Sequence, residues 1–202
     1  ILNFSSKGNN NLKDTNNLKT SINNDLSLKT FDYISDFGIK SNLGFHFKNV
    51  NTSAKNDSVY KSSLQSELMS IINFEGSMPL IKETEKYFNS LTPKFSFRIN
   101  PTDMKNYSNS KREINTSNLF AINRLGLDNT LEEGQSLTVG IDFRKEKLAE
   151  INKFFELNIG TIFRDETEER IPTNSTINQK SSNIFGSSTF GIYENLKINY
   201  DF

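Results

Sequence analysis

Hydrophobic and polar residues alternate with a period of two along most of this chain. The alternation is unbroken from residue 136 to residue 144. One face there carries Leu137, Val139, Ile141 and Phe143, and the other carries Ser136, Thr138, Gly140, Asp142 and Arg144. A period of two is typical of a β-strand with one apolar and one polar face.

The same alternation predicts strands near residues 43–48, 64–74, 92–100 and 155–163, and a hairpin over 184–202. We therefore predict an all-β antiparallel meander of about ten strands, each of about ten residues, which is the length of a tilted membrane-spanning strand. Before residue 35 the pattern is weaker. We expect turns at 8–10 and 23–25, where Asn and Gly cluster, and a one-residue bulge near Lys29 that restores the phase of Phe31 and Tyr33.

The predicted connections differ in length on the two sides of the sheet. Short turns are expected near Ser35, Lys145 and Glu194, and long polar loops over 51–60, 101–134 and 165–182. Residues 76–90 form an intermediate connector, in which 81–88 is the one stretch where a helical turn competes. Short turns on one side and long loops on the other are typical of an outer-membrane barrel.

The polar face decides between two architectures. In a soluble β-sandwich it is the outside, and in a large membrane barrel it lines the lumen. The apolar face consists mostly of Phe, Leu and Ile, and the polar face is rich in charged and amide side chains, which favours the barrel. The absence of Trp from an interfacial girdle counts against it, although Tyr and Phe also serve there.

Composition narrows the class of protein. Lys plus Arg and Asp plus Glu number 24 each, so the net charge gives no support for nucleic-acid binding. There is no Cys, which excludes disulfides and thiolate metal sites within these residues. We find no apolar run of about 18 residues and no signal-peptide pattern. Because the chain starts at Ile1 rather than at Met, we expect a segment of a longer protein.

Residues 119–144 also carry a resemblance to a known family. They read L-F-A-I-N-R-L-G-L-D-N, a polar spacer, Gly134, and the strand S-L-T-V-G-I-D-F-R. With Leu91-Thr92-Pro93 upstream, 155–160 downstream and a later strand ending in Tyr-Asp, this ordered set resembles the barrel domain of the LptD family of lipopolysaccharide-assembly proteins. The resemblance extends over about residues 77–202.

The resemblance implies a function and partners. Residues 1–202 would be an internal segment of a transmembrane outer-membrane β-barrel, in the form of an open curved sheet, located in the cell outer membrane of a Gram-negative bacterium. The barrel would receive lipopolysaccharide from periplasmic bridge proteins and place it in the outer leaflet. It would also contact the outer-membrane lipid bilayer and hold a plug lipoprotein of the LptE type. No cofactor, metal, nucleic acid or covalent chemistry is implied.

Several polar residues are candidates for specific roles. The residues predicted to face the lumen are Lys94, Arg98, Asp142, Arg144, Glu156 and Lys197. Two roles are open for the cations among them: ordinary solvation of the lumen, which is the commoner role for any one residue, and contact with lipid phosphates. Arg124 and Asp128 are expected to pair and to fold the long loop over or into the lumen. Glu132 and Glu133 are expected to form a solvated acidic turn, with divalent-cation binding as the alternative.

His46 is the single histidine, and no serine-rich or acidic motif flanks it, so we predict no catalytic site and no enzyme. Two other classes remain open. One is a small outer-membrane porin or receptor barrel, in which the first strand would close onto the last. The other is a soluble β-rich module, such as a carbohydrate-binding or adhesin domain, in which Phe95, Phe97, Val139 and Ile141 would be packed between two sheets.

Overall fold

The computed structural model describes residues 1–14, 16–58 and 60–202, which form a single antiparallel sheet. Its strands are β1 (Leu2–Lys13), β2 (Asn17–Lys29), β3 (Tyr33–Ile34), β4 (Lys40–Lys55), β5 (Gln65–Ser77), β6 (Leu80–Glu83), β7 (Tyr87–Asn100), β8 (Gly134–Lys147), β9 (Glu150–Arg164), β10 (Phe185–Tyr193) and β11 (Leu196–Asp201). Among the described residues there is no helix long and apolar enough to cross a membrane. The predicted all-β antiparallel meander is confirmed.

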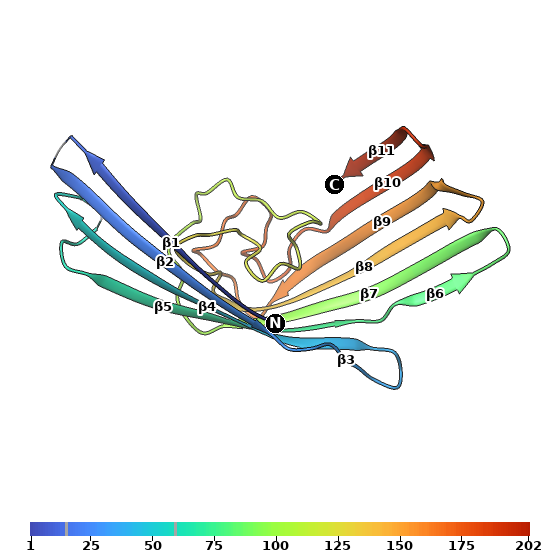
Figure 1. The fold of residues 1–202 in the computed structure, drawn as a ribbon, viewed down its shortest axis with the longest axis horizontal. Coiled ribbons are helices and arrows are strands. Elements are labelled where there is room, and N and C mark those ends of the chain that lie inside the picture. The colour runs from blue at the N-terminus through green and yellow to red at the C-terminus, as the bar shows by residue number, and fades with distance from the viewer. Residues whose placement is uncertain (15, 59) are drawn as a thin grey trace.

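The sheet follows the order of the chain. Its strands lie in the order β1-β2-β4-β5-β7-β8-β9-β10-β11, and each pairs with its neighbours. The short β3 continues the line of β2 along β4, and β6 continues the line of β5 along β7. Figure 1 shows the result, a sheet curved into a trough. In the described residues β1 pairs with β2 and β11 with β10, so the first strand does not close onto the last.

Apart from the short connection between β1 and β2, the connections separate by length as the alternating pattern predicted. At one end of the strands the turns are 35–39, 84–86, 148–149 and 194–195, and all are short. At the other end lie the turn between β1 and β2 and the longer connections 56–64, 101–133 and 165–184. Figure 1 shows the last two folded into the hollow of the trough. We call these two segments the inner loops, and the side of the sheet that they occupy the concave face.

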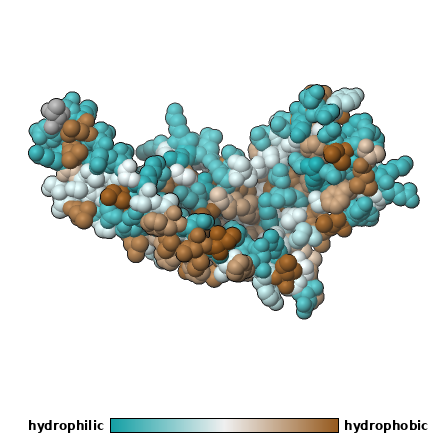
Figure 2. All heavy atoms as spheres, viewed as in Figure 1, coloured by the Kyte–Doolittle hydropathy of each residue, from teal (hydrophilic) through white to brown (hydrophobic). Residues whose placement is uncertain are grey.

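The convex face carries the exposed apolar side chains. Between 37% and 47% of the surface of each of the following residues is exposed: Phe47, Ile72, Phe74, Phe97, Leu137, Ile141 and Phe163. Brown apolar side chains gather along the convex lower side of the molecule in Figure 2. Phe95 and Phe97 pair across strands with Val139 and Leu137 and are not covered by a second sheet. The arrangement expected of a soluble sandwich is therefore absent from the described residues.

The part of the concave face that strands β7, β8 and β9 form is mostly polar. The alternate residues there are buried under the inner loops: Ser96, Arg98, Asn100, Ser136, Thr138 and Arg164. Apolar side chains of the inner loops form a core of their own, which contains Met104, Ile114, Leu119, Leu125, Leu127, Ile171 and Ile177. Ile162 of β9 and Phe185 of β10 complete this core from the sheet. The hydrophobic core thus lies inside the trough.

Several local expectations were wrong. Residues 8–10 and 23–25 lie inside β1 and β2 and form no turn. Strand β4 continues to Lys55, so the loop predicted over 51–60 begins later, and Val59 lies outside the described residues. The stretch 76–90 is not a connector with a helical turn but the end of β5, the strand β6, a tight turn and the start of β7.

The bulge near Lys29 is confirmed by the register of β4. Lys29 lies opposite Gly44, whereas Tyr33 lies opposite Ser41. Four steps along β2 and β3 therefore match three steps along β4, which is the signature of one extra residue. The extra residue keeps Leu28 and Tyr33 on the same, exposed side of the sheet.

Candidate functional site

The inner loops are fixed to the concave face by one buried carboxylate. Glu132, which lies just before β8, interacts with the guanidinium groups of Arg98, Arg124 and Arg164. Arg98 comes from β7, Arg164 from the end of β9, and Arg124 from the first inner loop. All four side chains are at most 5% exposed. The cluster therefore joins two strands and one loop at a single point that water does not reach.

The other hydrogen-bond donors of the three arginines bind the inner loops and strand β8. Arg124 donates from Nη1 to Thr138 Oγ1 at 3.0 Å and from Nη2 to Ser136 Oγ at 3.1 Å. Arg98 Nη2 donates to the carbonyl of Ile122 at 2.6 Å, and Arg164 Nε donates to that of Ile177 at 2.5 Å. Because Ile122 and Ile177 belong to different inner loops, the arginines hold both loops against the sheet.

Arg124 joins its loop to the concave face through a partner other than Asp128. The expected partner Asp128 is exposed, and its Oδ2 lies 3.7 Å from Nζ of Lys7. Arg124 instead pairs with Glu132 in a bidentate arrangement, in which Nε is 2.7 Å from Oε2. Burial lowers the pKa of Arg124 to about 9, so the guanidinium is still charged at neutral pH.

Glu132 and Glu133 do not form a solvated turn. Both are buried, with 4% and 7% of their surface exposed. Glu133 Oε2 accepts from the backbone N–H of Met104 at 2.8 Å and from Arg170 at 2.9 Å. Arg170 belongs to the second inner loop, so Glu133 joins the two loops to one another. The groups of three or more His, Cys, Asp or Glu side chains that could hold a metal are absent from the described residues.

A pair of glycines receives the tip of the first inner loop. Gly140 of β8 and Gly160 of β9 lie directly opposite each other. A Cβ at Gly140 would lie 2.9 Å from the Phe120 ring, and one at Gly160 would lie 2.5 Å from Leu119 Cδ2. Each would also lie within 3 Å of a backbone carbonyl oxygen of the neighbouring strand. The two glycines therefore form a notch that fits the Leu-Phe dipeptide of the resemblance.

The predicted lumen-facing residues all lie on the concave face. Lys94 Nζ is 2.6 Å from Asp142 Oδ2, and Arg144 binds both Glu156 and Glu146. Lys197 lies over the ring of Phe154, 5.6 Å from its centre. Arg98 differs from the others because the first inner loop covers it. Apart from Arg98, these charged groups line the part of the trough that the inner loops leave open.

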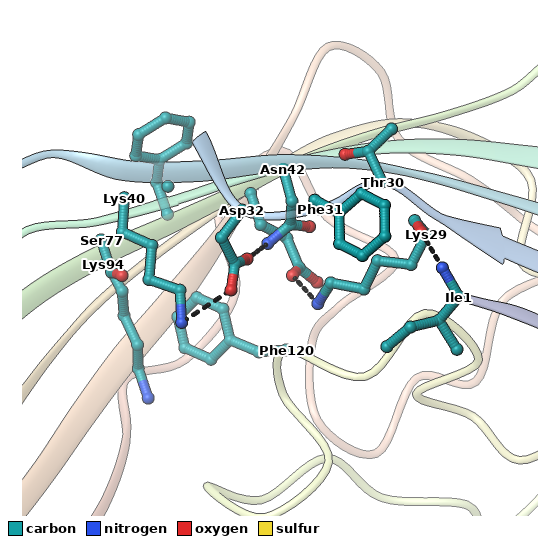
Figure 3. A pocket seen from close by; sticks show the side chains of 13 residues that line it. Ile1, Lys29, Thr30, Phe31, Asp32, Lys40, Asn42, Ser77, Lys94 and Phe120 are labelled. Carbon is teal, nitrogen blue, oxygen red and sulfur yellow. Dashed lines mark hydrogen bonds and ion pairs between the residues drawn. The ribbon is translucent and has the colours of Figure 1, made fainter. Parts of the chain in front are cut away.

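One open pocket lies beside the tip of the first inner loop. Its volume is about 520 Å³, and its cations are Lys29, Lys40 and Lys94. Figure 3 shows Lys40 paired with Asp32, and Lys29 reaching a neighbouring carboxylate, that of Glu75. The distances are 2.9 Å and 2.8 Å. Phe120 closes the pocket on the loop side, and Lys94 lies 4.5 Å from the centre of its ring. Each lysine comes from a different strand, β2, β4 or β7.

Sequence reasoning missed three features of this site. The buried arginine cluster joins residues that are 34, 8 and 32 positions from Glu132, so only the folded loops bring them together. The glycine notch was visible as two glycines, but not as a contact with Leu119 and Phe120. No motif beside His46 in the sequence indicates a partner, yet it is hydrogen-bonded to Ser27 and to Asp25 across β2 and β4.

Comparison with known proteins identifies the family of this chain. The model of the LptD family, described as LPS transport system D, matches residues 4–202. No curated protein matches the chain. The match covers nearly the whole antiparallel sheet together with both inner loops. LptD proteins transport lipopolysaccharide and assemble it at the outer membrane, where they are located. The chain therefore belongs to the LptD family of outer-membrane lipopolysaccharide transport proteins.

Proposed function

We propose that residues 1–202 form part of the barrel wall of the lipopolysaccharide translocon, with the concave face towards the lumen and the convex face towards lipid. The observation that carries this orientation is the contrast between the two faces. Exposed Phe, Leu and Ile cover the convex side, and ion pairs and buried arginines cover the concave side. A lipid-facing wall must be apolar, and its strands must satisfy their backbone groups by pairing.

The open pocket that contains Lys29, Lys40 and Lys94, which we call the lysine pocket, is the proposed contact for the phosphates of lipopolysaccharide. Its cations come from three strands, and Phe120 adds an apolar wall beside them. Glu75 holds Lys29 in place and Asp32 holds Lys40, and neither carboxylate occupies all three donors of its ammonium group. A phosphate oxygen entering the pocket would take up the remaining donors. No covalent step is needed for transport by this route.

The inner loops are proposed to close the lumen at the end that carries the long connections. In outer-membrane barrels the long loops are extracellular and the short turns periplasmic. The open half of the concave face, near the short turns, then faces the periplasm. That half is where periplasmic bridge proteins would deliver lipopolysaccharide and where a plug lipoprotein of the LptE type would bind.

Site-specific photo-crosslinking in the full-length membrane protein tests the orientation. A photoreactive amino acid at Lys94 or Arg144 is expected to crosslink to lipopolysaccharide in cells, because both positions line the open concave face. The matched positions Phe97 and Phe143 lie on the same two strands but on the convex face, and should crosslink to membrane lipid. Crosslinks to lipopolysaccharide from the convex pair alone would show that the two faces are reversed.

A further inference from the structure

Three polar side chains of β2 and β4 form a hydrogen-bonded chain on the concave face. Ser27 Oγ lies 2.6 Å from His46 Nδ1, and His46 Nε2 lies 3.0 Å from Asp25 Oδ1. Ser27 and His46 are directly opposite each other in the register of the two strands. Asp25 precedes Ser27 by two residues and so shares its face. The arrangement is therefore set by strand pairing and not by a flexible loop.

The direction of these hydrogen bonds follows from chemistry. An ionised carboxylate only accepts hydrogen bonds, so His46 Nε2 must carry a proton and donate it to Asp25. In the neutral imidazole Nδ1 is then the acceptor, and the hydroxyl of Ser27 donates to it. These are the roles of a serine nucleophile, a general base and a carboxylate that fixes the tautomer of the base. The two ring nitrogens are exchanged relative to the serine-protease triad, in which Nε2 faces the serine and Nδ1 faces the carboxylate.

The carboxylate is itself held in place. Nζ of Lys48 lies 2.6 Å from Asp25 Oδ1 and donates to the backbone carbonyl of Asp128 at 3.0 Å. Lys48 is buried, with 2% of its surface exposed. The first inner loop thereby fixes Lys48, Lys48 fixes Asp25, and Asp25 orients the imidazole. His46 is 7% exposed, so its imidazole is shielded from bulk water.

A small cavity opens beside the serine. Its volume is about 270 Å³, and its lining includes Ser27, Asn3, Phe120 and Ile122. Asn3 lies directly opposite Ser27 in the register of β1 and β2, on the side away from His46. A side-chain amide at that place can donate to the oxygen of a carbonyl group that Ser27 attacks. Phe120 and Ile122 provide an apolar wall for an acyl group.

We propose that Ser27, His46 and Asp25 form a hydrolytic centre that cleaves carboxylic esters with a small apolar acyl group. Ser27 Oγ attacks the ester carbonyl carbon while its proton passes to His46 Nδ1, and Asn3 donates to the carbonyl oxygen. The C–O bond to the alcohol breaks, and the alcohol leaves with the proton from His46. Water then attacks the acyl-serine, again through His46, and releases the carboxylic acid and free Ser27.

This activity goes beyond lipopolysaccharide transport and does not depend on it. The cavity beside Ser27 shares Lys29, Glu75 and Phe120 with the lysine pocket, but neither the lysines of that pocket nor the arginine cluster around Glu132 takes part in the chemistry. Ester hydrolysis can therefore be measured in the purified full-length protein with soluble reagents and without lipopolysaccharide. Failure of hydrolysis and failure of transport are consequently separate results.

The first experiment treats the full-length protein in lipid nanodiscs with a fluorophosphonate probe, which forms a covalent bond with activated serines. Mass spectrometry is expected to locate the probe on Ser27. His46→Asn should slow labelling by about a hundredfold or more, the usual contribution of a general base. Ser21→Ala is the matched control, because Ser21 lies on the same strand and face but opposite Thr52 rather than a histidine; it should label normally.

The second experiment follows release of p-nitrophenolate from p-nitrophenyl butyrate. Ser27→Ala should abolish the release, and Asp25→Asn should slow it and move the acidic limb of its pH profile to lower pH, because the imidazolium loses its carboxylate partner. A purely structural role for Asp25 would leave that profile in place. An unlabelled Ser27 in the unchanged, folded protein would overturn the proposal, and so would labelling that is equally fast in the His46→Asn variant.

Discussion

At the scale of single residues, the buried carboxylate of Glu132 is the point on which the inner loops depend. Three guanidinium groups converge on it, and each has lost most of its contact with water. Removing one partner from a buried ion pair is strongly destabilising, because the remaining charges have no solvent to compensate them. The cluster is therefore more vulnerable to substitution than any exposed pair in the described residues.

Replacement of Glu132 by Gln tests this dependence. We expect Glu132→Gln to destabilise docking of the inner loops by about 3–5 kcal/mol, the usual cost of breaking a buried pair. The measurement is the rate of proteolytic cleavage within residues 101–133 in the folded full-length protein, which should rise steeply. Asp128→Asn is the control from the same loop, because its exposed pair with Lys7 contributes little. Equal cleavage rates in the two variants would contradict the assigned role of Glu132.

At the scale of elements, alternation predicted the strands well because each strand separates two environments of different polarity. Phe97 and Arg98, for example, are adjacent in the chain, and one is exposed on the convex face while the other is buried on the concave face. A shift in the phase of the alternation was also predictable from the sequence. The bulge near Lys29 follows from the opposite parity of Leu28 and Tyr33 alone.

Turn signals failed where side chains found partners on neighbouring strands. Asn24 was expected to form a turn, because asparagine bonds readily to its own backbone. In the sheet its side chain accepts from Ser6 at 2.7 Å and donates to Asn49 at 3.2 Å. The partner of Arg124 and the triad of His46 were unpredictable for a related reason. They depend on the path of a 33-residue loop and on the register of two strands, and neither is encoded in a local pattern.

The second inner loop offers a test by pH. Burial, followed by the charge of Glu133, raises the pKa of Glu168 above its ordinary value. The folded state then binds the proton more tightly than the unfolded loop, so docking weakens as pH rises from about 4.5 through the raised pKa. We expect Glu168→Gln to protect the loop from proteolysis at neutral pH and to make no difference below that range. A constant gain at every pH would show that the charge of Glu168 is not the cause.

At the scale of the whole molecule, the curved sheet and the inner loops form one unit. The trough has an apolar outside, and its inside is filled at one end by a loop core and left open at the other. A barrel wall with this cross-section would be sealed towards the side of the long loops and accessible from the side of the short turns. The inner loops are held in the trough by the arginine cluster, by the notch formed by Gly140 and Gly160, and by the loop core that Ile162 and Phe185 complete.

Filling the notch should displace the tip of the first inner loop from the concave face. In Gly140→Val/Gly160→Val the new side chains would occupy the space of Phe120 and Leu119, and would also meet backbone oxygens that cannot move aside. We expect cells with this variant to admit vancomycin, a large polar antibiotic, because the displaced loop leaves an aqueous path through the barrel. Gly8→Val is the control, since a Cβ there meets nothing within 4 Å, and its β1 position should leave permeability unchanged. If the notch variant assembles normally in the membrane and still excludes vancomycin, the inner loops are not what closes the lumen.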